Sequence, residues 1–254
     1  LYPGDRSVKG SDIIIYGDNI TSLYCSDNKL SALDVSKNTS LKILECQNNK
    51  LTALNLPHGS DLWMLDCSDN HLTSLDVSKN TNYLEEVKCS NNQLTSLNVS
   101  DSSVVRLFCD HNRLTSLDLS KAASLGQLVC NNNQLTSLDL SKNTELAYLN
   151  CENNKLTSLA LSNQSANPFD VLNCRGNYLT MPTIFGLDLS RADAENYFYA
   201  PQTHVISSSV KVGEEIDLSS EYSVDGTVTE FIWYDGDGNV VEPATANGGK
   251  FTFG

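Results

Sequence analysis

Apolar and polar positions recur together along the chain from position 20 to position 182, with a period of about 21 residues. Within each period the order is Leu-x-x-Leu-x-Cys-x-x-Asn-x-Leu, and the stretch from Leu41 to Leu51 carries it without a departure. Successive cysteines follow one another at intervals that differ from this period by two positions at most, and an asparagine stands three positions after each. The cysteines are Cys25, Cys46, Cys67, Cys89, Cys109, Cys130, Cys151 and Cys174. A fixed period of this length predicts a solenoid, in which each repeat packs against its neighbours.

The pattern inside one repeat predicts a short strand. In the third repeat Leu62, Leu65 and Cys67 must face the core, and the alternation around Leu65 and Cys67 is that of a strand buried on one side. Equivalent strands of successive repeats would pair in parallel. The rest of the unit, such as residues 30–39, is rich in Ser, Asp and Asn. We therefore expect extended chain and short 3₁₀ pieces there rather than α-helix.

The asparagine and the cysteine of each repeat have different expected roles. A buried amide after the strand can both donate to and accept from backbone groups of neighbouring coils. Cysteines on neighbouring parallel strands lie about 4.8 Å apart with parallel Cα–Cβ vectors. A disulfide needs β-carbons about 3.8 Å apart and turned toward each other. We therefore expect a ladder of buried free thiols that act as small apolar side chains.

These residues resemble the leucine-rich repeat family, and the repeat unit with cysteine is most similar to the bacterial internalin type. The resemblance covers residues 20–182. It implies a right-handed leucine-rich repeat solenoid with a parallel β-sheet on the concave face and an extended or 3₁₀ convex side. We expect an N-terminal cap at residues 1–19, eight repeats with a closing segment at residues 20–198, and a different β domain at residues 199–254.

The repeat pattern is absent from the C-terminal stretch, residues 199–254. Residues 205–207, 210–218, 227–234 and 250–253 have the composition of short strands separated by turn signals. Trp233, two residues after Phe231, resembles the core tryptophan of an immunoglobulin-like sandwich. Such a sandwich needs about 100 residues, so we expect a partial immunoglobulin-like module. Residues 235–239 alternate Asp, Gly and Asn, but Val240 and Ala246 do not fit a calcium loop, and a turn between strands is favoured.

The net charge of the chain excludes some classes of binding partner. Seventeen basic against 31 acidic residues give a net charge of −14, which would repel nucleic acid and anionic membranes. No apolar run approaches the roughly 18 residues of a membrane-spanning helix. The four histidines have no recurring nucleophile and carboxylate beside them, and no two cysteines are close enough in the sequence to form a Cys-x-x-Cys ligand pair. We therefore expect no enzyme, no metal site and no cofactor.

The variable positions of each strand are the candidate binding residues. Positions three and one before each cysteine project outward from the sheet and take almost every residue class, whereas the inward positions are nearly uniform. Aromatic residues with charged neighbours are typical of protein interfaces. The candidate ligand-binding residues, including Trp63 at the adjoining edge, are Tyr24, Ile43, Glu45, Trp63, Met64, Asp66, Glu86, Lys88, Arg106, Phe108, Val129 and Tyr148.

The resemblance implies a non-catalytic protein-recognition or adhesion module, either secreted or on the bacterial cell surface, that binds a protein ligand such as a host protein through the concave face. Two alternatives stay open. The same face could bind a glycan, with Tyr24, Trp63 and Tyr148 as stacking platforms. The solenoid could also be a passive spacer for another module.

Overall fold

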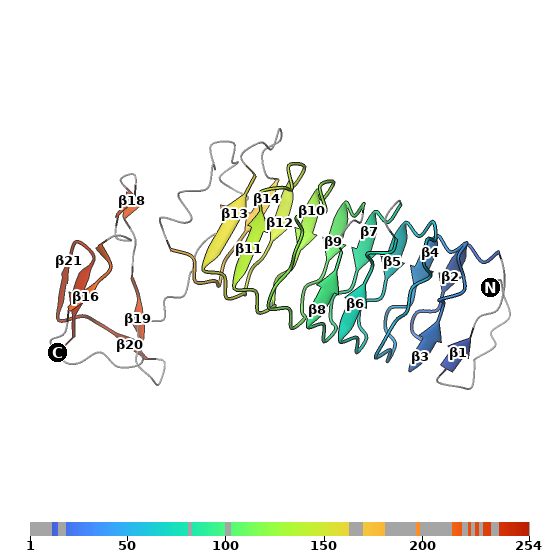
Figure 1. Cartoon of the computed structure of the whole chain (residues 1–254). Coiled ribbons are helices and arrows are strands. Elements are labelled where there is room, and N and C mark those ends of the chain that lie inside the picture. Colours follow the sequence, from blue (N-terminus) through green and yellow to red (C-terminus); the bar gives the residue numbers. More distant parts are fainter. Residues whose placement is uncertain are drawn as a thin grey trace.

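The computed structural model describes residues 12–14, 19–80, 83–99, 103–162, 170–180, 197–198, 215–219, 223–224, 227–228, 231–234 and 239–253. Every named element in these residues is a β-strand. Within the same residues, no helix is long and apolar enough to cross a bilayer. The strands of the repeats follow one another along the solenoid in chain order (Figure 1).

The main sheet has nine parallel strands, and eight of them end directly before one of the eight cysteines. In spatial order the strands are β2 (Ser22–Tyr24), β4 (Ile43–Glu45), β5 (Met64–Asp66), β7 (Glu86–Lys88), β9 (Arg106–Phe108), β10 (Gln127–Val129), β12 (Tyr148–Asn150), β14 (Val171–Asn173) and β15 (Tyr197–Phe198). This arrangement confirms the predicted one-strand repeat. The ninth strand, β15, pairs with β14 in the segment expected to close the solenoid.

The opposite side carries shorter ladders. Three parallel pairs form there, namely β1 (Asp12–Ile14) with β3 (Ala32–Asp34), β6 (Ser74–Asp76) with β8 (Ser96–Asn98), and β11 (Ser137–Leu140) with β13 (Ser158–Leu161). The expected extended chain is therefore confirmed. The expected 3₁₀ pieces are absent from the described residues, where single turns occur instead, such as Asn38 N–H to Val35 C=O at 2.9 Å.

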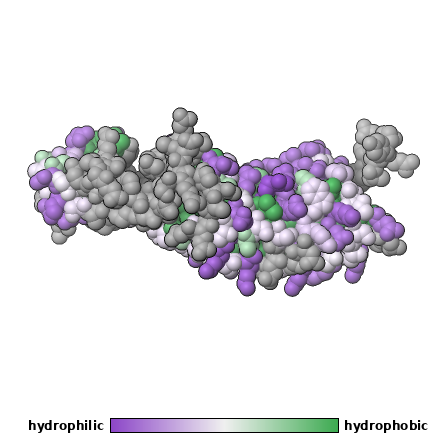
Figure 2. All heavy atoms as spheres, turned by 90° about the horizontal axis from the view of Figure 1, so that it is seen from above, coloured by the Kyte–Doolittle hydropathy of each residue, from purple (hydrophilic) through white to green (hydrophobic). Residues whose placement is uncertain are grey.

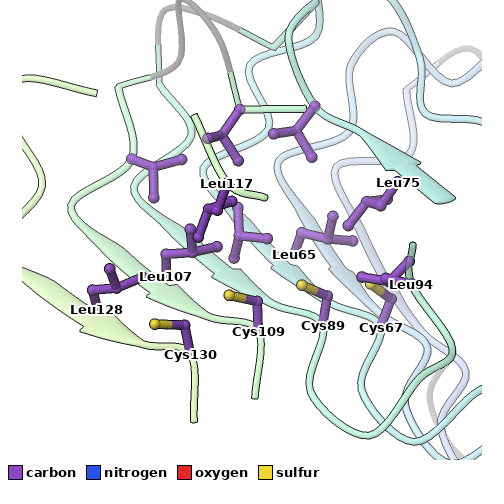
Figure 3. Close-up of a cluster of buried hydrophobic side chains, with 14 of the residues drawn as sticks. Leu65, Cys67, Leu75, Cys89, Leu94, Leu107, Cys109, Leu117, Leu128 and Cys130 are labelled. Atoms are coloured by element: carbon purple, nitrogen blue, oxygen red, sulfur yellow. The ribbon is translucent and has the colours of Figure 1, made fainter. Parts of the chain in front are cut away.

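The cysteines form the predicted ladder in the core. All eight are free and buried, and Cys46 to Cys174 are 0% exposed. Figure 3 shows Cys67, Cys89, Cys109 and Cys130 in a row, beside a second row that contains Leu65, Leu107 and Leu128. Burial raises the pKa of the thiols, to about 11 for Cys25 and Cys174 at the two ends of the row. The ladder therefore consists of neutral thiols at neutral pH.

The recurring asparagines satisfy backbone groups of two coils, as expected. Asn112 is typical: its Nδ2 donates to Cys89 O at 3.0 Å and to Cys109 O at 3.1 Å. Its Oδ1 accepts a hydrogen bond from the N–H of Leu94, one repeat earlier, at 2.9 Å. The same pattern links the neighbouring repeats through Asn49, Asn70, Asn92, Asn133, Asn154 and Asn177.

The residue before each of the eight recurring asparagines, Asn28 included, has a left-handed backbone. Its φ lies between 52° and 60° in all eight repeats. Asn, Asp, His and Gly are the residues that tolerate this conformation best. The left-handed backbone therefore explains why this position holds only Asn, Asp, Gly and, at position 111, His. The slot is filled by Asp27, Asn48, Asp69, Asn91, His111, Asn132, Asn153 and Gly176.

A second set of buried asparagines lies on the convex side. Asn38, Asn80 and Asn143 are 4%, 1% and 1% exposed. Asn143 Nδ2 donates to Leu119 O at 3.1 Å and to Ala122 O at 2.7 Å, one repeat earlier. The Ser-Lys-Asn segments that hold Asn80 and Asn143 thus also link successive coils.

The described C-terminal strands form small antiparallel sheets. They are β16 (Glu215–Asp217), β22 (Lys250–Thr252) and β21 (Thr245–Asn247) in one sheet, and the hairpins β17 (Ser223–Val224) with β18 (Thr227–Val228) and β19 (Trp233–Tyr234) with β20 (Val240–Val241). Trp233 packs against Phe231, Phe251 and Phe253 with ring centroids 4.9 to 6.3 Å apart. Residues 235–238, which hold most of the predicted turn, lie outside the described residues. The expected strand at residues 205–207 lies outside the described residues.

Candidate binding face on the main sheet

The register of the main sheet aligns the variable residues in two columns. The residues of the first column are paired in the order Ser22, Ile43, Met64, Glu86, Arg106, Gln127, Tyr148 and Val171. Those of the second are Tyr24, Glu45, Asp66, Lys88, Phe108, Val129, Asn150 and Asn173. The residue between each pair is buried on every strand. All the predicted candidate residues therefore fall on one face, apart from Trp63 at its edge.

Exposed apolar residues are unevenly distributed over the solenoid. Among its described residues, the large apolar side chains with the greatest exposure are Tyr24, Trp63 and Tyr83, at 58%, 38% and 56%. Trp63 directly precedes β5, and its carbonyl accepts hydrogen bonds from the N–H groups of Glu85 and Glu86 at the start of β7. In the view of Figure 2, hydrophobic residues form small patches among hydrophilic ones rather than one continuous apolar surface.

Tyr83 was not predicted as a candidate. It lies in the interval that has one extra residue, between the convex turn and β7. A sequence signal was present, since an aromatic residue stands where the other repeats hold Ser, Asp, Glu, Asn or Pro. Because the position lies outside the strand, the alternation that identified the other residues does not extend to it.

A charged cluster occupies the centre of the face. Glu86 accepts from Arg106 Nε at 2.5 Å through one oxygen, and its other oxygen lies 2.7 Å from Lys88 Nζ. Burial of the Glu86 carboxyl opposes its ionisation, but the hydrogen bonds and charges of Lys88 and Arg106 outweigh this effect and lower its pKa. Lys88 Nζ also lies 5.9 Å from the centre of the Phe108 ring.

This cluster corrects one part of the sequence prediction. Glu86 was expected to project outward beside Glu45 and Asp66 as an accessible carboxylate. Glu86 is only 8% exposed, because the side chains of Lys88 and Arg106 cover its carboxylate. The accessible charges at the centre are therefore the basic groups of Lys88 and Arg106, whose side chains are 34% and 44% exposed.

Beyond Arg106 the two columns of the face carry neither an acidic nor a basic side chain on the described strands. The residues there are Phe108, Gln127, Val129, Tyr148, Asn150, Val171 and Asn173, and all are partly exposed. Asn173 Nδ2 donates to Glu152 at 3.0 Å beside the face. This half combines apolar side chains with amides, a composition suited to a neutral partner surface.

The histidine near the face has no catalytic geometry. Asp110 lies between Ser90 and His111: the Ser90 hydroxyl donates to one carboxylate oxygen, and His111 Nδ1 lies 2.8 Å from the other. A serine nucleophile needs a direct bond to the imidazole that removes its proton. In the part of the chain that the structure describes, no three His, Cys, Asp or Glu side chains are grouped to hold a metal ion.

Comparisons with known proteins agree with this architecture. A scan against protein-family models gives no match, and a search of curated proteins gives none. Among solved structures, the chain is similar to the functional domain of InlJ from Listeria monocytogenes, which includes a cysteine ladder: 35% identity over 71% of this chain and 41% of that one, with a TM-score of 0.60. It is also similar to YopM, a leucine-rich effector protein from Yersinia pestis, with 25% identity over 69% of this chain and 54% of that one and a TM-score of 0.51.

The parallel solenoid with leucines in its core is a leucine-rich repeat fold. Its repeat spacing and its ladder of cysteines match the internalin-like type of leucine-rich repeat protein. The chain spans about half or less of the length of these solved proteins.

Proposed function

We propose that this chain is a non-catalytic recognition module that binds a protein partner through the outward face of the main sheet. One observation carries the proposal: the inward positions are almost invariant from repeat to repeat, whereas the two outward columns hold almost every residue class in strict register. The scaffold does not require this variety. Tyr24, Trp63 and Arg106 are of the types that concentrate binding energy in interfaces.

The setting of this function is also part of the proposal. Likeness to InlJ supports adhesion or recognition by a bacterial surface or secreted protein, with a host protein as one such ligand. Fold alone does not determine function, so the outward face and its chemistry remain the main argument. Residues 199–254 are proposed to be part of an immunoglobulin-like module, supported by the antiparallel strands and by the aromatic cluster at Trp233.

The test is a parallel screen of the purified chain against an array of extracellular proteins and an array of glycans. Each hit is then measured with the variant Trp63→Ser/Met64→Ser/Phe108→Ser. A matched control, Ile232→Ser/Val240→Ser, removes exposed apolar side chains from the C-terminal sheets, where the two residues are 61% and 59% exposed.

Loss of binding to a protein in the triple variant, with binding retained in the control and circular dichroism unchanged in both, supports the proposal. Equal binding by the triple variant and the parent chain contradicts it and favours a passive spacer. Hits confined to the glycan array would make the face a glycan site with Tyr24, Trp63 and Tyr148 as stacking groups.

A further inference from the structure

The exposed aromatic residues mark one half of the binding face. Tyr24 on β2 and Trp63 before β5 flank the outward residues Ile43 and Met64, which pair in register on β4 and β5. From β9 onward, no large apolar residue in the described part of the solenoid is exposed to the same extent. Exposed apolar groups that gather in one area mark interaction sites more often than scattered ones do.

Two carboxylates lie within the same area. Glu45 and Asp66 are directly paired in register on neighbouring parallel strands. Among the residues that the structure describes, neither carboxylate forms an ion pair. Like charges side by side on a sheet destabilise it. The fold therefore retains an unfavourable pair next to exposed aromatic rings.

The basic residue next to Asp66 on the sheet, Lys88, forms its ion pair with a different carboxylate. Lys88 is the register neighbour of Asp66, yet its ammonium lies 2.7 Å from Glu86, on its own strand. Arg106 lies on the other oxygen of the same carboxylate. Glu86 thus holds both cations of the face, and the charge of Glu45 and Asp66 is left for an external group.

We infer that this N-terminal patch (Tyr24, Ile43, Glu45, Trp63, Met64 and Asp66) binds a basic segment of the partner protein, one that presents arginine or lysine between apolar residues. The inference rests on the proposed recognition function and specifies its partner. The alkyl stems of such residues pack on Met64 and Tyr24, and their charged heads reach the two carboxylates. Arginine in addition stacks on the exposed aromatic rings. A second copy of this chain, with a net charge of −14, is a poor occupant because it would be repelled.

The decisive variant is Glu45→Gln/Asp66→Asn, which removes both charges and retains the size of the side chains. Asp66 Oδ1 accepts from Ser68 N–H at 3.1 Å. Asn150 and Asn173 make the same bond at the equivalent positions of later repeats, at 3.2 and 3.3 Å, so Asn is compatible with position 66.

The matched control is Asp118→Asn/Asp139→Asn on the convex side, which changes the net charge by the same amount. These two residues accept from Ser120 and Ser141 N–H at 3.0 and 2.9 Å, and an asparagine oxygen can do the same. Asn98 already occupies this position next to Asp76. Any difference between the two variants therefore reports where the charge is, not how much charge there is.

The probes are three fluorescein-labelled peptides of equal length that alternate Arg with Leu, Arg with Ser, and Glu with Leu. We expect the Arg/Leu peptide to bind the parent chain, with its Kd raised about tenfold or more by Glu45→Gln/Asp66→Asn and by less than about twofold by the control. The Arg/Ser peptide should bind more weakly, because it lacks apolar contacts, and the Glu/Leu peptide should not bind. Equal weakening by the two variants would show a non-specific response to net charge and overturn the inference, as would no binding of Arg/Leu.

The outcome is separable from that of the proposed function. A protein partner whose capture is lost in Trp63→Ser/Met64→Ser/Phe108→Ser but unchanged in Glu45→Gln/Asp66→Asn would leave the recognition function standing and remove the basic segment from it. A glycan ligand that depends on Trp63 and not on the two carboxylates would contradict both proposals and make the face a glycan site. A partner lost in both variants supports both proposals.

Discussion

The side-chain oxygen of Asn133 accepts a hydrogen bond from the backbone N–H of Leu114, one repeat earlier, at 3.0 Å. The amide nitrogen of the same residue donates to Cys109 O at 3.0 Å and to Cys130 O at 3.1 Å. One side chain therefore bonds backbone groups of two buried coils, and Cys109 O and Cys130 O each accept from a second asparagine as well, Asn112 and Asn154 respectively. It lies 8% exposed in the middle of the solenoid.

Replacement of this amide should be costly. Asn133→Leu keeps the volume but leaves the N–H of Leu114 unpaired and removes one of the two amide donors from Cys109 O and from Cys130 O, so we expect a loss of about 1–3 kcal/mol in the free energy of unfolding. Urea denaturation followed by circular dichroism measures it. The neighbouring Asn132→Gly is the control: its φ is 55°, and Gly176 occupies the same slot at 60°, so it should change stability by less than about 1 kcal/mol. Equal losses in the two variants would contradict the role of Asn133.

Thiol reactivity should follow burial along the cysteine ladder. Native protein at pH 8 is expected to react slowly with Ellman's reagent, with Cys25 modified first because it is 6% exposed while the other seven are 0% exposed. Mass spectrometry after timed quenching identifies the modified positions, and denatured protein gives the reference of eight. Rapid modification of most cysteines in the native protein would mean that the strands face the opposite way.

Stability should fall in alkaline solution. Burial raises the pKa of the thiols above the ordinary value of 9.0, to about 11 for Cys25 and Cys174. The free energy of unfolding is not reduced by thiol ionisation below pH 9. It decreases as the pH rises above 9, because the thiols of the unfolded chain then lose protons that the folded chain keeps. Between pH 9 and the raised pKa of its thiol, each cysteine should lower the free energy of unfolding by up to about 1.4 kcal/mol per pH unit.

Urea denaturation at pH 7, 9 and 10 tests this prediction, with Cys25→Ala/Cys174→Ala for comparison. Removal of two of the eight thiols should reduce the decline between pH 9 and 10 by about a quarter of the part that the cysteines contribute, since the slope is a sum over titrating groups. Other groups titrate equally in both proteins, so the difference isolates the cysteines. An unchanged slope would show that these thiols are not held neutral by the fold.

The Glu86 cluster should contribute to stability in a pH-dependent way. Glu86→Gln leaves Lys88 and Arg106 without a counter-charge, and since both cations are partly solvated we expect a loss of only about 1 kcal/mol at pH 7. The folded-state pKa of Glu86 is lowered, so its contribution is present above the ordinary value of 4.5 and is lost as the pH falls below it. The two proteins should therefore converge in stability at acidic pH. A gap that stays constant from pH 7 to pH 3 would assign the loss to packing.

Most of the solenoid was predictable because its signals are local and repeated. The cysteine marks the inward side of each strand, and the two flanking positions must then face outward, which placed residues such as Glu45 and Phe108 correctly. The same regularity predicted that the asparagine after each strand bonds backbone groups of neighbouring coils. Periodicity cannot describe how outward side chains contact one another within a column or between columns, so the burial of Glu86 under Arg106 and Lys88 required the structure.

Other features were missed because ordinary turn chemistry accounts for the same residues. Asn143 stands in a Ser-Lys-Asn-Thr segment that suggests a solvent-exposed turn, yet it is 1% exposed and bonded to the previous repeat. His111 occupied a slot that looked variable, and its φ of 52° shows that the slot requires a left-handed backbone. Tyr83 lies outside the strand alternation altogether.

The register has a consequence for how such a face can change. The interval from Cys67 to Cys89 has one position more than the common period, and the next interval has one fewer. Glu86 is still aligned with Met64 on one side and with Arg106 on the other, because the irregularity is absorbed between strands. A single insertion there leaves the register of the main sheet unchanged.

Duplication or loss of a whole repeat instead shifts everything beyond it by one strand spacing of about 4.8 Å. The distance between the N-terminal patch and the Lys88–Arg106 centre can therefore change only in fixed steps, while the chemistry at each step changes by single substitutions.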